Sequence, residues 1–168
     1  EGWAGLNKDS LYTKYFQMPY TIWEPKYKED ENDSLEFRIV KIDWDNIGIT
    51  TLPESISNPT ELTYLDLAGN NLTSLPSGIR DLSNLIDLII YENLLITIPS
   101  GIGFLSKLKV LEAYNNVLNE LPSTIGNLTS LLELRIQNNL LQSLPLGLCE
   151  IIPQITNFNV ACNQLIIG

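Results

Sequence analysis

The sequence predicts an α/β solenoid, a fold in which one small unit is stacked many times along a single axis. Four similar segments begin with leucines that are 23 residues apart: Leu62, Leu85, Leu108 and Leu131. Each segment opens with apolar residues in the alternating pattern of a half-buried strand. Each then carries an Asn and a Pro at fixed offsets. A period in this range indicates an array of supersecondary units that share one continuous core.

The opening residues of each unit, such as Leu85, Leu88 and Ile90, predict a short strand with one buried face. Stacked units then form a parallel sheet on the concave side of the array. One column of amides follows the strands: Asn70, Asn93, Asn116, Asn139 and Asn163. Because an amide both donates and accepts hydrogen bonds, we expect this column to satisfy the backbone of the bends. Its role is structural.

A second column consists of prolines: Pro53, Pro76, Pro99, Pro122 and Pro145. Proline fixes φ and supplies no donor, which suits a turn into an irregular or short helical segment. Apolar residues of that segment, such as Ile79 and Leu82, close the core from the convex side. We therefore expect an irregular or short-helical convex side behind the parallel sheet.

Residues 39–168 are predicted to hold about five full coils and a partial sixth, and residues 1–38 an N-terminal cap of the same domain. The first coil has Ile47 at the Asn offset, with Asn46 one place early. An end coil has no neighbour, so a cap must cover its apolar face. The array stops at Gly168 without a closing segment, so we expect a chain continuation or an additional subunit there.

Within the cap, a helix is expected between the capping residues 7–10 and Pro19. Residues 20–23 predict a strand, residues 24–34 a polar loop, and residues 35–44 a second strand. Three tryptophans are expected to pack in the cap and core: Trp3, Trp23 and Trp44.

The word LxxLxLxxNxLxxLPxxIxxLxx resembles the leucine-rich repeat signature in its 23-residue LPxxI type, over roughly residues 39–168. Trp23 and residues 38–43 are similar to the N-terminal cap of plant-type extracellular leucine-rich repeat proteins, whose cap cysteines are absent here. The resemblance implies a horseshoe arc. It also implies protein recognition on the concave face without catalysis.

Composition excludes several other functions. A chain of 168 residues with a net charge of −10 fits one domain and disfavours nucleic acid as a partner. The absence of histidine removes the commonest general base and metal ligand. No apolar run approaches the roughly 18 residues of a membrane span. We expect no enzyme activity, no cofactor and no membrane insertion.

Outward positions of the strands, which alternate with the buried ones, are the candidate partner-binding residues. They are Tyr64, Asp66, Asp87, Ile89, Tyr91, Glu112, Tyr114 and Arg135. Aromatic and apolar side chains rimmed by charge are typical of protein-binding hot spots. The pattern predicts a protein or peptide partner with a basic or amphipathic segment. The alternative is that these residues only stabilise the sheet through cross-strand packing.

Other readings of the surface remain open. Asp43, Asp45 and Asp66 are a remote candidate for a Ca²⁺ site, and the same acids for a glycan-active enzyme. A row of hydroxyls suggests an ice-binding surface, although Glu120 interrupts it: Thr51, Ser74, Thr97 and Ser143. Two further alternatives are an intracellular scaffold or regulator of signalling proteins, and a structural subunit of a larger assembly.

Localisation is predicted to be extracellular or at the cell surface, with the cytoplasm as the alternative. The acceptor pattern for N-glycosylation occurs at Asn32, Asn71 and Asn127. Cys149 and Cys162 have offsets on different sides of a coil, so we expect them not to pair with each other.

Overall fold

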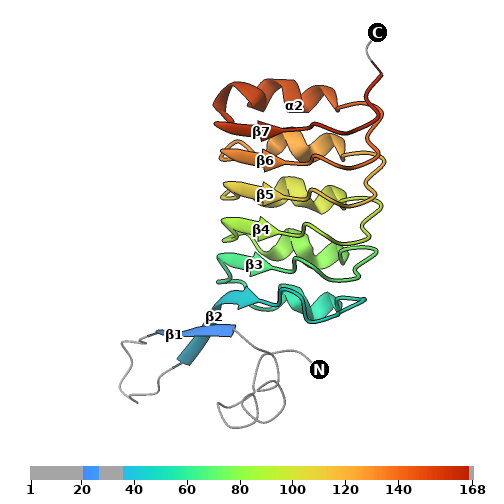
Figure 1. The fold of residues 1–168 in the computed structure, drawn as a ribbon. Coiled ribbons are helices and arrows are strands. Elements are labelled where there is room, and N and C mark those ends of the chain that lie inside the picture. The colour runs from blue at the N-terminus through green and yellow to red at the C-terminus, as the bar shows by residue number, and fades with distance from the viewer. Residues whose placement is uncertain (1–20, 27–35, 167–168) are drawn as a thin grey trace.

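The computed structural model describes residues 21–26 and 36–166, and the expected cap helix lies outside these ranges. Its architecture is one seven-stranded sheet in chain order, with short helical turns stacked behind it (Figure 1). The parallel strands are β2 (Glu36–Asp43), β3 (Tyr64–Asp66), β4 (Asp87–Ile89), β5 (Val110–Glu112), β6 (Glu133–Arg135) and β7 (Asn157–Asn159). The predicted solenoid with a parallel sheet is confirmed.

The remaining strand, β1 (Thr21–Lys26), pairs antiparallel with β2, so that Thr21 lies opposite Ile42. The strand predicted at residues 20–23 is therefore correct in kind but too short. Residues 24–26 are wrongly assigned to the polar loop, because the eight residues of β2 offer them pairing partners. Pro25 is tolerated since β1 lies at the edge of the sheet.

The convex side consists of short 3₁₀ helices, as the proline column predicts. They are η1 (Glu54–Ser57), η2 (Ser77–Asp81), η3 (Ser100–Phe104) and η4 (Ser123–Asn127). A proline with extended backbone precedes each of them; Pro76, for example, has φ −67° and ψ 153°. The proline therefore ends the extended stretch of each coil and sets the chain into the helical turn.

The coil that begins at Leu131 differs on its convex side. It carries an α-helix, α2 (Leu146–Ile151), followed by η5 (Ile152–Gln154). Leu131 and Ile155 are 24 residues apart, one more than the usual period. This extra residue gives the segment after Pro145 room for a full α-helical turn.

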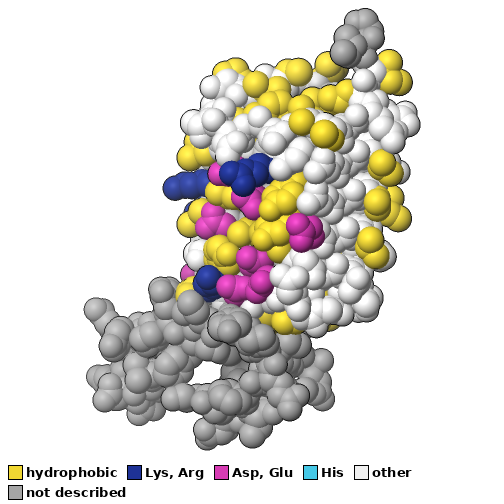
Figure 2. All heavy atoms as spheres, viewed as in Figure 1, with side chains coloured by type: hydrophobic (Ala, Val, Ile, Leu, Met, Phe, Trp, Pro, Cys, Tyr) yellow, Lys and Arg dark blue, Asp and Glu magenta, His cyan; other side chains and the backbone are white. Residues whose placement is uncertain are grey.

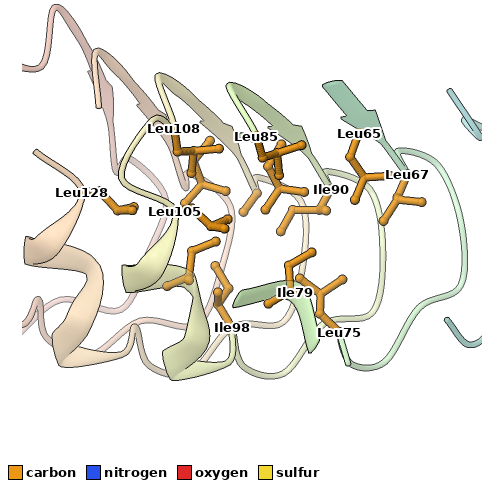
Figure 3. Packing of buried hydrophobic residues seen from close by; sticks show 14 of the residues in the cluster. Leu65, Leu67, Leu75, Ile79, Leu85, Ile90, Ile98, Leu105, Leu108 and Leu128 are labelled. Carbon is orange, nitrogen blue, oxygen red and sulfur yellow. The ribbon is translucent and has the colours of Figure 1, made fainter. Parts of the chain in front are cut away.

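The core lies between the sheet and the convex turns. Leu65, Leu67 and Ile90 point inward from the strand side, and Ile79 and Ile98 meet them from the convex side (Figure 3). None of these five side chains is more than 3% exposed. Every coil contributes to this single cluster, so no coil has a separate core.

Adjacent convex turns approach closely at two glycines. A Cβ atom on Gly103 would lie 2.6 Å from the carbonyl oxygen of Thr124. A Cβ atom on Gly126 would lie 2.5 Å from the carbonyl oxygen of Gly147, in α2. The convex turns therefore stack at this spacing only because these positions carry no side chain.

The asparagine column forms the expected hydrogen-bonded ladder. Asn93, buried behind the sheet, donates from Nδ2 to the carbonyl oxygens of Leu67 (2.9 Å), Ile90 (3.2 Å) and Tyr91 (3.2 Å). Its Oδ1 accepts the Leu72 amide at 3.0 Å. The other ladder residues repeat this pattern: Asn70, Asn116, Asn139 and Asn163. Each amide thus ties its own bend to the preceding coil.

The residue before each ladder position has a left-handed backbone. Its φ lies between 52° and 63° at Asn46, Gly69, Glu92, Asn115, Asn138 and Cys162. Asn and Gly adopt this conformation readily, whereas Glu and Cys are strained in it. Asn46 is thus explained as the left-handed residue of the first coil and not as a displaced ladder residue.

We expect Glu92→Asn to raise the free energy of unfolding by about 0.5–1 kcal/mol, because Asn tolerates the left-handed backbone. The side-chain contact between residue 92 and Asn115 would be kept. Asn138 already donates to Asn115 Oδ1 at 2.7 Å, and an amide at position 92 offers Asn115 a similar oxygen. Urea unfolding measures the change. Glu120→Asn, at an exposed residue whose φ is not positive, is the matched control. Equal effects of the two substitutions would contradict the backbone explanation.

Candidate functional site

The concave face of the sheet carries all eight predicted partner-binding residues. Along each of the strands β3 to β6, a buried residue stands between two half-buried ones, so the outward side chains form columns across the sheet. We define the concave patch as the apolar and aromatic side chains Tyr64, Ile89, Tyr91, Val110 and Tyr114. Figure 2 shows hydrophobic side chains over the middle strands with acidic side chains around them.

Two tyrosines form the most ordered part of the concave patch. The rings of Tyr91 and Tyr114 stack with their centroids 4.4 Å apart and an interplanar angle of 7°. They occupy the same offset in successive coils, so the period of the repeat aligns them. Both rings stay partly accessible to solvent. The result is a rigid aromatic surface that offers large contact area with little side-chain entropy to lose.

The N-terminal end of the concave patch is a cation–aromatic cluster. The Lys41 ammonium lies 4.1 Å from the centroid of the Tyr64 ring and 3.5 Å from Asp43 Oδ2. The Tyr64 hydroxyl donates to Asp66 Oδ2 at 3.0 Å. Asp66 Oδ1 accepts the Ala68 amide, also at 3.0 Å. Tyr64 is therefore held by neighbours on both sides.

The C-terminal end is an ion-pair network. Arg135 contacts Glu133 through Nε at 2.6 Å and Glu112 through Nη1 at 3.2 Å. Glu133 also accepts a hydrogen bond from Asn157 Nδ2 at 3.0 Å. Arg135 is thus paired with two acids of its own chain and holds them together on this face.

Burial changes the ionisation of the acids on this face. It raises the pKa of Asp66, although hydrogen bonds from Ala68 and Tyr64 oppose the rise. Burial also raises the pKa of Asp87, against the nearby Lys109, and the pKa of Glu112, against Arg135. Acids with a raised pKa bind protons more readily in the folded chain than in the unfolded one, so stability falls as pH rises through the raised pKa. At neutral pH these three acids are therefore charged, and their ionisation lowers the free energy of unfolding.

The tyrosines titrate outside the physiological range. Burial raises the pKa of Tyr114 to about 12, and the charges of Tyr91 and Glu112 add to the rise. Burial followed by the charge of Asp66 raises the pKa of Tyr91. The rings therefore stay neutral and keep their hydroxyls as hydrogen-bond donors at neutral pH.

Three further residues belong to this face. Lys41 and Gln137 lie at outward offsets, where the period of the repeat could have selected them. The Gln137 Oε1 atom, next in the column after Tyr114, is buried without a hydrogen-bond partner. Ala68 has an outward offset but is fully buried, which differs from the expected alternation. Its short methyl group does not rise above its larger neighbours.

The remaining sequence candidates lie apart from the concave patch or do not assemble. Within residues 21–26 and 36–166, no group of three or more Asp, Glu, His or Cys side chains is placed to hold a metal ion, Asp43, Asp45 and Asp66 included. Asn71 and Asn127 are exposed, and Asn32 lies outside the described residues. Cys149 and Cys162 are both free and exposed, which agrees with the expected absence of a bridge between them.

The hydroxyl row is also exposed, at Thr51, Ser74, Thr97 and Ser143. Glu120, which takes the same offset in the coil between Thr97 and Ser143, is exposed too. Trp44 packs in the core at 6% exposure, while the side chains of Trp3 and Trp23 lie outside the described part. No helix in the described ranges is long and apolar enough to cross a membrane.

Comparison with solved structures places this geometry in a known class. The chain is similar to the leucine-rich repeat protein LIC12759 of Leptospira interrogans, with 30% identity over 77% of this chain and a TM-score of 0.60. It is also similar to YopM of Yersinia enterocolitica, with 33% identity over 76% of this chain and a TM-score of 0.63. The chain spans 38% and 25% of those two proteins.

The leucine-rich repeat ectodomain of the receptor kinase SOBIR1 from Arabidopsis thaliana shares the fold. Its identity is 23%, its TM-score is 0.76, and the match covers 88% of this chain and 83% of that one. No protein-family model and no curated protein sequence matches the chain. The repeat, the ladder and these structures together show that the chain is a leucine-rich repeat protein. Domains of this class typically serve as protein-interaction modules and are usually non-catalytic.

Proposed function

We propose that the chain is a non-catalytic recognition module that binds a protein or peptide segment across the concave patch. The observation that carries the proposal is the Tyr91–Tyr114 stack, partly exposed at the middle of the face and surrounded by half-buried acids. Aromatic rings that are already fixed lose little side-chain entropy when a partner binds, and aromatic residues are enriched among the hot spots of interfaces. Cross-strand packing alone does not require acids to be kept around them at a cost in stability.

The double variant Tyr91→Ala/Tyr114→Ala tests this proposal. The partner is a peptide selected from a displayed random library against the unmodified chain, and its affinity is measured by calorimetry. We expect the double variant to weaken binding by 30-fold or more, because truncation of a hot spot typically costs at least about 2 kcal/mol. Its thermal midpoint should fall by only a few degrees, since an aromatic pair contributes about 0.5–1.5 kcal/mol beyond area burial.

Phe104→Ala is the matched control. Phe104 is 67% exposed on the convex side, so its truncation removes a solvent-accessible ring far from the concave patch. Binding should be unchanged in this variant. Failure of the library to yield any peptide sensitive to the tyrosine pair would contradict the proposal. Unfolding of the double variant would instead support a purely structural role for the stack.

We further propose that the protein acts outside the cell or at its surface. The support is the likeness to a receptor-kinase ectodomain and the exposure of two glycosylation acceptors, Asn71 and Asn127. The intact mass of protein purified from its natural source tests this localisation. Glycans on either residue would exclude the cytoplasm, whereas two unmodified cysteines in a mass without glycans would favour the intracellular alternative.

A further inference from the structure

At the two ends of the concave face, cations of the chain itself pair with its acids. At the N-terminal end, Lys41 lies over the Tyr64 ring and beside Asp43. At the C-terminal end, Arg135 pairs with both Glu112 and Glu133. Figure 2 shows basic side chains on either side of the central hydrophobic area. The face therefore already contains two cations held by acids, one of which, Lys41, also lies over an aromatic ring.

The centre of the face has two acids, Asp66 and Asp87, that no cation of the described residues contacts. Asp66 accepts hydrogen bonds only from the neutral Tyr64 hydroxyl and the Ala68 amide, and it makes no ion pair in the described part of the chain. Asp87 forms neither a side-chain hydrogen bond nor an ion pair with any residue in the described ranges. Lys109 lies near enough to influence the pKa of Asp87 without contacting it. No cation of the described residues therefore contacts either of these two half-buried carboxylates.

These carboxylates surround one apolar side chain. Ile89 lies directly opposite Asp66 on one neighbouring strand and opposite Glu112 on the other. Asp87 and Tyr91 lie two residues before and after it on the same face. With strands about 4.8 Å apart, a group above Ile89 is within reach of Asp66 and Asp87. The ring of Tyr91 has Tyr114 on one side and only the methyl of Ala68 as its neighbour in register on the other.

We propose that Asp66, Asp87 and Ile89 form a subsite for an arginine side chain of the bound segment. The methylene stem of the arginine would rest on Ile89 while its guanidinium pairs with Asp66 and Asp87. Arginine fits better than lysine because its planar guanidinium presents several donors and can bond two carboxylates at once. The subsite rests on the proposed function, since it specifies which segment the concave patch selects.

Partial burial strengthens this preference. Asp66 and Asp87 are half-buried, so water hydrates their charged forms less well, and this burial raises the pKa of both. A carboxylate that is already partly dehydrated loses less solvation when a cation arrives. Glu112 does not compete with Asp66 and Asp87 for the arginine of the bound segment, because Arg135 already pairs with Glu112.

The test uses two blocked peptides, acetyl-hexa-arginine amide and acetyl-hexa-lysine amide, titrated into the full chain at 150 mM salt. We expect the arginine peptide to bind more tightly than the lysine peptide. The double variant Asp66→Asn/Asp87→Asn should weaken the arginine peptide about tenfold. The matched control, Glu120→Gln/Glu150→Gln, removes the same charge from exposed residues off the concave face and should change binding less than twofold.

A single variant guards against loss of folding. Asp66 supports the Ala68 amide, so its replacement could disturb the bend, whereas Asp87 makes no such bond. Asp87→Asn alone should therefore weaken the arginine peptide about threefold with an unchanged circular dichroism spectrum. Equal weakening by the concave and control variants, or no binding of the arginine peptide, would overturn the subsite. If a library peptide still depends on Tyr91 and Tyr114 in that case, the subsite fails while the proposed function stands.

Discussion

Asn93→Ala is expected to lower the free energy of unfolding by about 2–4 kcal/mol. The Asn93 amide donates to three carbonyl oxygens, those of Leu67, Ile90 and Tyr91, and accepts the Leu72 amide. The residue is 5% exposed, so water cannot replace these bonds without opening the bend. The Leu72 amide would lose its acceptor, which costs about 1–3 kcal/mol, and the loss of the bonds to the carbonyl oxygens adds to this. Those oxygens keep other donors: Asn70 Nδ2, Asn116 Nδ2 and the Gly69 amide.

Chemical denaturation of Asn93→Ala beside Asn119→Ala measures this effect. Asn119 is exposed and makes no side-chain hydrogen bond to a described residue, so its truncation should stay within about 0.5 kcal/mol of the unmodified chain. Because the ladder joins neighbouring coils, Asn93→Ala should also speed amide exchange at Leu72, one coil back. A loss below about 1 kcal/mol would show that the ladder is not a major source of stability.

Gly126→Ala is expected to destabilise the chain by about 2–3 kcal/mol, a typical cost of overpacking a closely fitted contact. The new Cβ would meet the carbonyl oxygen, carbonyl carbon and Cα of Gly147 at 2.5, 2.6 and 2.8 Å. All three are backbone atoms, so no side chain can turn away to make room. The coil carrying α2 would have to move away from the coil carrying η4, which weakens the contacts between them.

Gly147→Ala is the matched control for this prediction. There the nearest atom to a new Cβ is the Ser123 carbonyl oxygen at 3.2 Å, and Gly147 lies within α2. The close contact of the new Cβ with the Ser123 carbonyl oxygen is offset by the better helix propensity of Ala, about 1 kcal/mol over Gly. Thermal unfolding should therefore separate the two variants clearly. Equal midpoints would mean that the convex side relaxes more freely than its backbone spacing suggests.

The periodic part of the fold could be predicted from the sequence because each column repeats one physical requirement. Strand leucines, ladder asparagines and prolines all lie where their offsets place them. Single deviations were harder to predict. One added residue before Ile155 converts a 3₁₀ turn into α2, and pairing with β2 extends β1 beyond Trp23.

The candidate site was only half predictable for a related reason. The period of the repeat selects which residues face outward, so all eight predicted residues lie on one face. It does not specify rotamers or charge pairing. Arg135 is bound to Glu112 and Glu133, whereas Asp87 forms no ion pair with a described residue. Both facts depend on side-chain positions that differ from coil to coil. Partner preference is carried by those differences.

The ladder also determines how the molecule would carry a load. Its long-range hydrogen bonds reach back about one coil, as from Asn93 to Leu67 or from Asn116 to Ile90, and never further. Tension applied along the array is therefore resisted by one interface between coils at a time. Each coil that detaches would release about 80 Å of extended chain, at about 3.5 Å for each of its residues. Such a chain yields in equal steps and can stretch severalfold before its last coil opens.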